Sequence, residues 1–104
     1  MAEEKEDVVL FMTTMSSSLE VKKKCQKILT VMASVSSTHN LVEKDISQPG
    51  GLANMRETLK NPKALPPQLY SEKLGPLGGY ELFENAVEDG KLLEFLKKEY
   101  TFEG

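Results

Sequence analysis

The spacing of apolar residues along this chain predicts alternating strands and helices. The uninterrupted apolar run from Val8 to Met12 is typical of a central strand covered on both faces. From residue 19 to about residue 32, apolar side chains recur at helical spacing with lysines mostly on the other face, which predicts an amphipathic helix capped by Ser18. Residues 39–46 predict a second strand. Strand, helix and strand in this order imply a parallel pair with a right-handed crossover.

The second half of the chain predicts one more helix, a short hairpin and two final helices. We expect a helix with Ser47 as its cap and Pro49 just inside its start, strands at residues 68–72 and 76–78, and helices at residues 80–88 and 92–96. The order β-α-β-α-β-β-α-α predicts the α/β class, with a mixed four-stranded sheet and helices on both faces. This is the thioredoxin-like topology.

Composition and charge narrow the class of protein. A length of 104 residues, with 39% hydrophobic and 28% charged residues, suits one globular domain, which we assign to residues 8–104 after a disordered acidic tail at residues 1–7. The net charge of −3 leaves no dominant basic face, so we expect no nucleic-acid partner. The longest apolar run is too short to span a membrane. One cysteine and no visible secretory signal suit the cytosol, with the nucleus as a further location.

Several fragments, in order and at matching spacing, resemble one known family. They are Glu20-Val21-Lys22, Asp45-Ile46-Ser47-Gln48, Asn61-Pro62-Lys63-Ala64, Pro66-Pro67-Gln68-Leu69, Gly79-Tyr80-Glu81-Leu82-Phe83 and Leu92-Leu93-Glu94-Phe95-Leu96. Over about residues 8–97 the chain resembles the SH3-domain-binding glutamic-acid-rich-like proteins. The resemblance implies a glutaredoxin-type fold without the Cys-x-x-Cys of the enzymes, and therefore a protein that is not an enzyme.

The residues at the expected active-site loop support that implication. Met15, Ser16, Ser17 and Ser18 stand where glutaredoxins carry their reactive cysteines. A glutaredoxin thiol reacts because the helix N-terminus favours its thiolate. Serine is no substitute, because its hydroxyl does not ionise near neutral pH without a general base and cannot form a disulfide.

Cys25 is the one thiol, and it lies about 10 Å along the helix from Ser18 on the predicted apolar face. We interpret it as a buried structural residue. A residual glutathione-dependent oxidoreductase that uses Cys25 is the alternative. One cysteine and one histidine, His39, cannot build a zinc site, so we expect no metal and no cofactor.

The likeness to glutaredoxins also predicts a groove, which we call the vestigial groove. Pro67 matches the cis-proline of glutaredoxins, and Gly78, Gly79, Tyr80 and Glu81 match the helix entrance that receives glutathione. With Met15 to Ser18, Leu65 and Pro66 they form our candidate contact surface for a peptide or for glutathione. We expect glutathione to bind only weakly. The Glu81 carboxylate already lies in the favourable field of the helix N-terminus, and Thr13 and Thr14 replace the basic residue that often holds glutathione in glutaredoxins.

The proline segment raises SH3 and EVH1 domains as candidate partners. Ala64-Leu65-Pro66-Pro67 departs from the Pro-Leu-Pro-Pro of the family, and no two prolines of the segment are three apart. Residues 66–70 resemble an EVH1 ligand with Tyr70 in place of phenylalanine. If these residues are part of the sheet, neither motif is available to a partner. The functional hypothesis is therefore a protein-interaction module that uses the vestigial groove.

Overall fold

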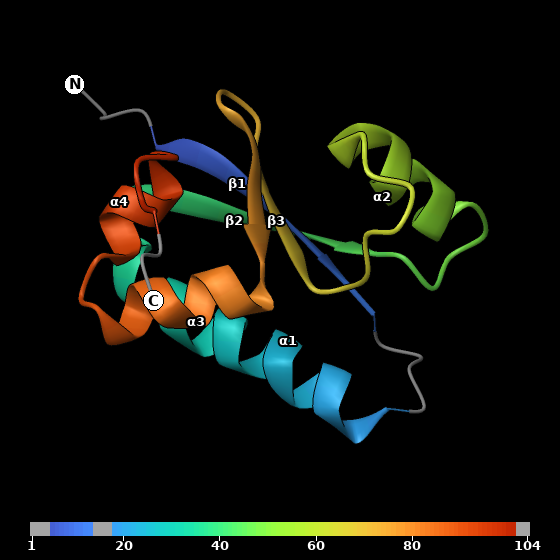
Figure 1. Ribbon diagram of the computed structural model, residues 1–104, viewed down its shortest axis with the longest axis horizontal. Coiled ribbons are helices and arrows are strands. Elements are labelled where there is room, and N and C mark those ends of the chain that lie inside the picture. Colours follow the sequence, from blue (N-terminus) through green and yellow to red (C-terminus); the bar gives the residue numbers. More distant parts are fainter. Residues whose placement is uncertain (1–4, 14–17, 102–104) are drawn as a thin grey trace.

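The computed structural model describes residues 5–13 and 18–101 and shows a mixed four-stranded sheet with helices (Figure 1). The elements in chain order are β1 (Glu6–Met12), α1 (Leu19–Met32), the 3₁₀ turn η1 (Ala33–Val35), β2 (His39–Asp45), α2 (Gly51–Leu59), β3 (Gln68–Ser71), β4 (Gly75–Gly79), α3 (Tyr80–Glu88) and α4 (Leu92–Leu96). The predicted fold class is confirmed.

Strand β1 is the centre of the sheet, whose order is β2-β1-β3-β4. It pairs in parallel with β2 and antiparallel with β3, and β3 pairs antiparallel with β4. Residues Val8 to Phe11 are all buried, as expected for a strand covered on both faces. The continuous apolar run in the sequence therefore marks a strand with a neighbour on each side and a helix layer on each face.

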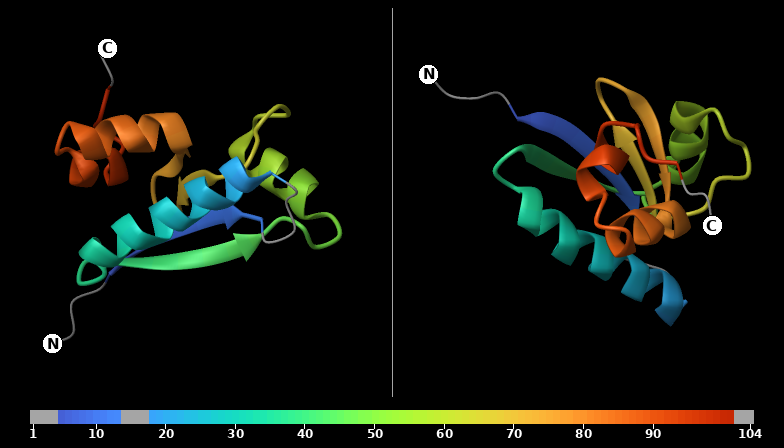
Figure 2. Two further views of the ribbon diagram at one scale, coloured as in Figure 1. Left: turned by 90° about the horizontal axis from the view of Figure 1, so that it is seen from below. Right: turned by 60° about the vertical axis from the view of Figure 1, so that its left-hand side comes forward.

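Alternation along β1 creates two separate apolar clusters. Val8 and Leu10 pack with residues of α1, α3 and α4, whereas Val9 and Phe11 pack with Met55 and Leu59 of α2. Figure 2 shows the same division, with α1 and α3 on one face of the sheet and α2 on the other. Among the α-helices of the described residues, α2 is the one that packs against the second face of the sheet.

The start of α1 follows the prediction, and the start of α2 does not. Ser18 caps α1 by accepting the Val21 N–H at 3.3 Å. Ser47 caps no helix, because its own N–H and O–H donate to Asp45 Oδ1 at 3.0 and 2.6 Å in a local turn. Helix α2 begins later, after Gly50 in the left-handed region at φ 77°. The prediction of Ser47 as cap and Pro49 in the first turn was therefore wrong.

Some predicted boundaries also move. Strand β1 includes Glu6 and Asp7, which we assigned to the N-terminal tail, because their backbones pair with His39 and Asn40 of β2. The remainder of that predicted tail, residues 1–4, lies outside the described residues, whereas Lys5 is described and exposed. Strands β2 and β3 each end one residue earlier than predicted, and β4 is one residue longer at each end.

The close approach of Gly51 to Ile46 generates a prediction about stability. A Cβ atom on Gly51 would lie 2.6 Å from both the Cα and the carbonyl oxygen of Ile46. We expect Gly51→Ala to lower the free energy of unfolding by about 1–3 kcal/mol, since the backbone must move to admit the methyl group. Urea unfolding followed by circular dichroism measures this.

The neighbouring glycine supplies the control. A Cβ atom on Gly50 would have no other atom within 4 Å, and asparagine tolerates the positive φ of this residue. Gly50→Asn should therefore leave the unfolding free energy close to that of the parent protein. Equal losses in the two variants would show that the contact with Ile46 is not what requires glycine.

Candidate functional site

A groove of about 570 Å³ lies between α1, the segment that precedes β3, and the start of α3. Most of its lining is apolar, with one cation from α1 and one anion from α3. The lining residues are Val21, Lys24, Leu65, Pro66, Pro67, Gln68, Gly79, Tyr80, Glu81 and Leu82. The groove therefore coincides in large part with the surface that the sequence predicts.

The segment before β3 is held in shape by Gln68. Its side-chain amide donates to the Leu65 carbonyl at 2.9 Å. Gly79 lies opposite Gln68 in the β3–β4 pair, and a Cβ on Gly79 would come within 3.1 Å of the Gln68 amide nitrogen. The Pro66–Pro67 peptide bond is cis, as predicted, and Pro67 is buried. Leu65 projects from this ordered segment with 64% of its surface exposed.

A chain of polar contacts joins α1 to α3 at Tyr80, which lines the groove. Lys24 Nζ lies 5.4 Å from the centre of the Tyr80 ring and 3.2 Å from Glu20 Oε1. The Tyr80 hydroxyl donates to Glu84 Oε2 at 2.8 Å, and Lys27 Nζ donates to the same oxygen at 3.2 Å. These contacts set the position of the Tyr80 ring as one wall of the groove.

The same contacts shift the acidity of their members. Hydrogen bonds from the Tyr80 hydroxyl and from Lys27 lower the pKa of Glu84 below its ordinary value. Burial, followed by the bond to Glu84, raises the pKa of Tyr80. The Glu84 carboxylate also raises the pKa of Lys27. Near neutral pH the contacts therefore join an anionic Glu84 to a neutral phenol and a cationic amine.

The structure brings together six of the eleven residues predicted for the groove: Leu65, Pro66, Pro67, Gly79, Tyr80 and Glu81. Ser18 is described but does not line the groove, since it caps α1. Gly78 lies in β4 behind the lining, where its φ of 145° and the nearby Leu82 side chain favour glycine. Met15, Ser16 and Ser17 lie outside the described residues. A binding role for this surface stays a prediction.

A family match and a structural likeness connect the chain to known proteins. A family model described as SH3-binding, glutamic acid-rich protein matches residues 7–99. The chain belongs to this family. The match begins at β1 and continues past α4, so it includes every described residue that lines the groove.

A solved structure supports the fold independently. A chain described as "Actin interacting protein 5 (Aip5, wild type)" is similar over 90% of this chain and 95% of its own length. The TM-score is 0.64 and the sequence identity is 19%. At that identity the likeness shows the shared thioredoxin-like fold alone.

Four residues that line the groove were not predicted from the sequence: Val21, Lys24, Gln68 and Leu82. The pattern of residues 19–32 places the lysines mostly on the face away from the apolar residues, and Lys24 departs from that pattern because it lies against Tyr80. The helical spacing of Val21 and Lys24, three residues apart, was the available signal. It became informative only once α1 and α3 were known to share a face of the sheet.

Cys25 is buried, with 3% of its surface exposed, and does not line the groove. It borders a separate hollow of about 290 Å³ together with Thr13 and Lys22. Burial raises the pKa of its thiol, although hydrogen bonding with the Thr13 backbone opposes the shift. The thiolate form that attacks disulfides is therefore disfavoured at this position.

His39 is far from the groove, at the opposite end of the sheet. It pairs with Glu6 at the first register position of β1 and β2, whereas the groove lies beyond Phe11 and Gln68. The ring is buried, with Nδ1 2.8 Å from Thr38 Oγ1 and Nε2 3.4 Å from Glu6 Oε2. It lies on the edge strand of the sheet, and its Nε2 makes no hydrogen bond within the described residues.

Residues 5–13 and 18–101 contain neither a cluster of metal-ligating side chains nor a membrane-spanning helix. Among these residues, no group of three or more histidine, cysteine, aspartate and glutamate side chains could hold a metal ion. No helix in the same part of the chain is long and apolar enough to cross a membrane.

The link between α1 and α3 predicts a pH dependence of stability. Because the folded-state pKa of Glu84 lies below the ordinary value of 4.5, its carboxylate stabilises the fold above that pH, and the contribution is lost as the pH falls through the folded-state pKa. We expect Glu84→Gln to be less stable than the parent near pH 7, with a difference that shrinks below about pH 4. Urea unfolding at several pH values measures this difference.

Glu57→Gln provides the control, since Glu57 is an exposed residue of α2 without an ion pair in the described part of the chain. Its unfolding free energy should follow that of the parent at each pH. A Glu84→Gln penalty that stayed constant from pH 7 to pH 3 would contradict an electrostatic origin.

Proposed function

We propose that this chain acts as a non-catalytic protein-binding module whose vestigial groove holds an extended segment of a protein partner. The observation that carries the proposal is Leu65, a large apolar side chain that is 64% exposed on a segment fixed by Gln68. An exposed apolar residue on an ordered frame loses little conformational entropy when a partner covers it. The family name and the name of the actin-interacting relative both support a protein as the ligand.

The proposal favours the groove over the proline segment as the recognised element. Gln68 and Leu69 pair with Phe11 and Leu10 of β1 on one side and with β4 on the other. A proline-rich SH3 or EVH1 ligand must be exposed and extended along its length. Because the strand that follows Pro67 is paired on both sides, residues 66–70 are not free to bind as an extended ligand. A partner would contact Leu65 and the groove instead.

Glutathione is the second candidate ligand, and Lys24 is the observation that favours it. This cation lines the groove and could meet a carboxylate of the tripeptide, although it already lies 3.2 Å from Glu20. Glu81 also lines the groove, and its negative charge opposes the binding of a second carboxylate. We expect a backbone amide NMR titration with glutathione to give at most millimolar binding, with shifts confined to the neighbours of Gln68 and Tyr80.

Leu65→Asn tests the proposed module. Affinity enrichment from cell extract with quantitative mass spectrometry should show specific partners whose yield falls several-fold in this variant, because the apolar contact is lost. Leu93→Asn is the matched control, since Leu93 is 46% exposed on α4, away from the groove. Partners that are lost equally in both variants, or in neither, would contradict recognition through the groove.

A turnover assay tests the absence of catalysis. With a mixed disulfide of glutathione and a small thiol as substrate, we expect neither the parent protein nor Cys25→Ser to exceed the uncatalysed rate, since the thiol is buried and its thiolate is disfavoured. Turnover in the parent that disappears in Cys25→Ser would establish the oxidoreductase alternative.

A further inference from the structure

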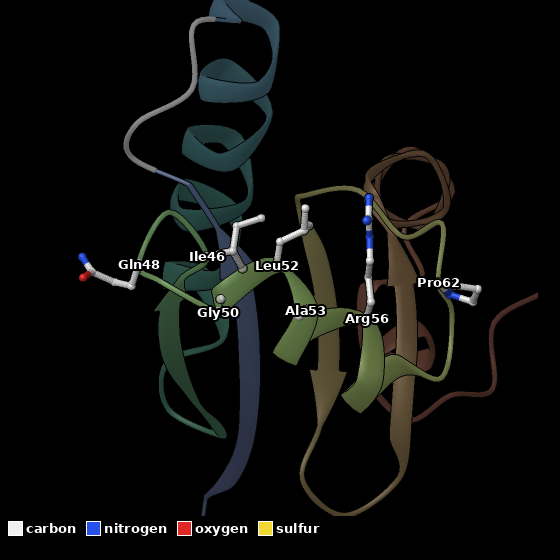
Figure 3. Close-up of a pocket in the computed structure, with 8 residues that line it drawn as sticks. Ile46, Gln48, Gly50, Leu52, Ala53, Arg56 and Pro62 are labelled. Atoms are coloured by element: carbon white, nitrogen blue, oxygen red, sulfur yellow. The ribbon is translucent and has the colours of Figure 1, made fainter.

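A second pocket lies on the α2 side of the sheet, at the start of that helix (Figure 3). Its volume is about 570 Å³, and Ile46, Leu52, Ala53 and Pro62 supply its apolar lining. It shares no lining residue with the vestigial groove. The two hollows are therefore separate sites with different lining chemistry.

Close backbone packing leaves the pocket unfilled. The Gly51 backbone lies directly against the Ile46 backbone, where even a Cβ atom would approach within 2.6 Å. Helix α2 can therefore begin against the end of β2 without a side chain between them. Leu52, the next residue, keeps 36% of its surface exposed, so apolar surface remains for a ligand to cover.

Arg56 places a fixed positive charge beside this apolar lining. Its Nε donates to the Ala64 carbonyl at 3.0 Å, which fixes the guanidinium and leaves the terminal nitrogens as further donors. No carboxylate of residues 5–13 or 18–101 forms an ion pair with it. In Figure 3, the side chains of Ile46, Leu52 and Arg56 extend on the same side of α2.

Gln48 and Pro62 mark the two flanks of the pocket. Figure 3 shows Gln48 and Pro62 at opposite flanks, with both side chains directed away from the space between Leu52 and Arg56. Neither of these two side chains therefore fills the space between Leu52 and Arg56. This geometry suits an internal peptide segment better than a chain end.

We propose that this pocket binds an acidic peptide segment of a protein partner, in which an apolar side chain covers Leu52 and a neighbouring aspartate or glutamate pairs with Arg56. The guanidinium offers two parallel N–H donors to one carboxylate, and the adjacent apolar surface adds contact area. The inference is independent of the function proposed for the vestigial groove. It gives the chain two binding surfaces on opposite faces of its sheet.

Synthetic peptides test the chemistry of recognition. The probe is acetyl-Gly-Leu-Glu-Leu-Gly-amide, and the control peptide has glutamine in place of glutamate. In backbone amide NMR titrations, the probe should shift the signals of Gly51 to Arg56, and the control should bind at least tenfold more weakly, because a charge-assisted hydrogen bond is lost. A third peptide, acetyl-Gly-Gly-Leu with a free C-terminal carboxylate, tests a chain end as the ligand.

Matched variants test the role of Arg56 without removing its contact to Ala64. Ala53 is exposed and lies three residues before Arg56, so Ala53→Glu supplies a carboxylate that can pair with the guanidinium within the helix. We expect this variant to bind the probe about tenfold more weakly than the parent. Ala53→Gln has nearly the same shape without the charge, so it measures the loss that comes from a larger side chain in the pocket lining, and Ala53→Glu should bind the probe clearly more weakly than Ala53→Gln. Circular dichroism and unshifted groove signals verify that both variants are folded.

Several results would overturn the inference. They are equal affinity for the glutamate and glutamine peptides, tighter binding of the peptide with the free C-terminus, shifts that appear at Gln68 and Tyr80 instead of at α2, equal losses in both Ala53 variants, or no shift with the probe at millimolar concentration.

Discussion

Burial of β1 between two apolar layers is the constraint on which the rest of the structure depends. Val8 and Leu10 pack in one layer, and Val9 and Phe11 pack in the other. Each such side chain stabilises the fold by about 1.5–3 kcal/mol when it is fully buried. Because the same strand also pairs with β2 and β3, it fixes the sheet, both helix layers and the end of the sheet at which chain segments meet.

The vestigial groove follows from this arrangement. Phe11 pairs with Gln68, so the proline segment lies beside the carboxyl end of β1. The hairpin then brings Gly79 opposite Gln68 and begins α3 at Tyr80. Since α1 and α3 cover the same face, Lys24 reaches the Tyr80 ring. The groove is therefore a consequence of strand register and shared helix face, and it needs no cysteine to keep its shape.

The sequence predicts those parts of the fold that depend on local chemistry. The apolar run of β1, the Ser18 cap and the bounds of α3 at Tyr80 and Glu88 each follow from neighbouring residues, and each is confirmed. The start of α2 could not be predicted in this way. Two local motifs compete for Ser47, and its hydrogen bonds to Asp45 prevail over a helix cap.

The groove shows the same limit on what a sequence reveals. Leu65, Pro67 and Tyr80 were predicted because a family motif carries them, and the structure places them together. Lys24 and Leu82 were missed, because periodicity assigns a residue to a face of its helix but does not say which other helix lies beside that face. Arg56 was visible only as a member of an amphipathic helix. Its position beside an unfilled apolar pocket depends on the contact between Gly51 and Ile46.

Both candidate surfaces lie at the end of the sheet where the parallel strands finish. Ile46 donates its N–H to the Met12 carbonyl at 2.8 Å, so the Arg56 pocket begins where β1 ends, and the proline segment of the groove lies beside the same strand end. Open α/β sheets generally bind ligands outside the carboxyl ends of their strands. Helix α2 covers one face of the sheet there, and α1 and α3 cover the other. The two surfaces therefore lie on opposite faces of the sheet near the same end of β1. Both surfaces therefore depend on the burial and register of β1, and Cys25 lines neither of them.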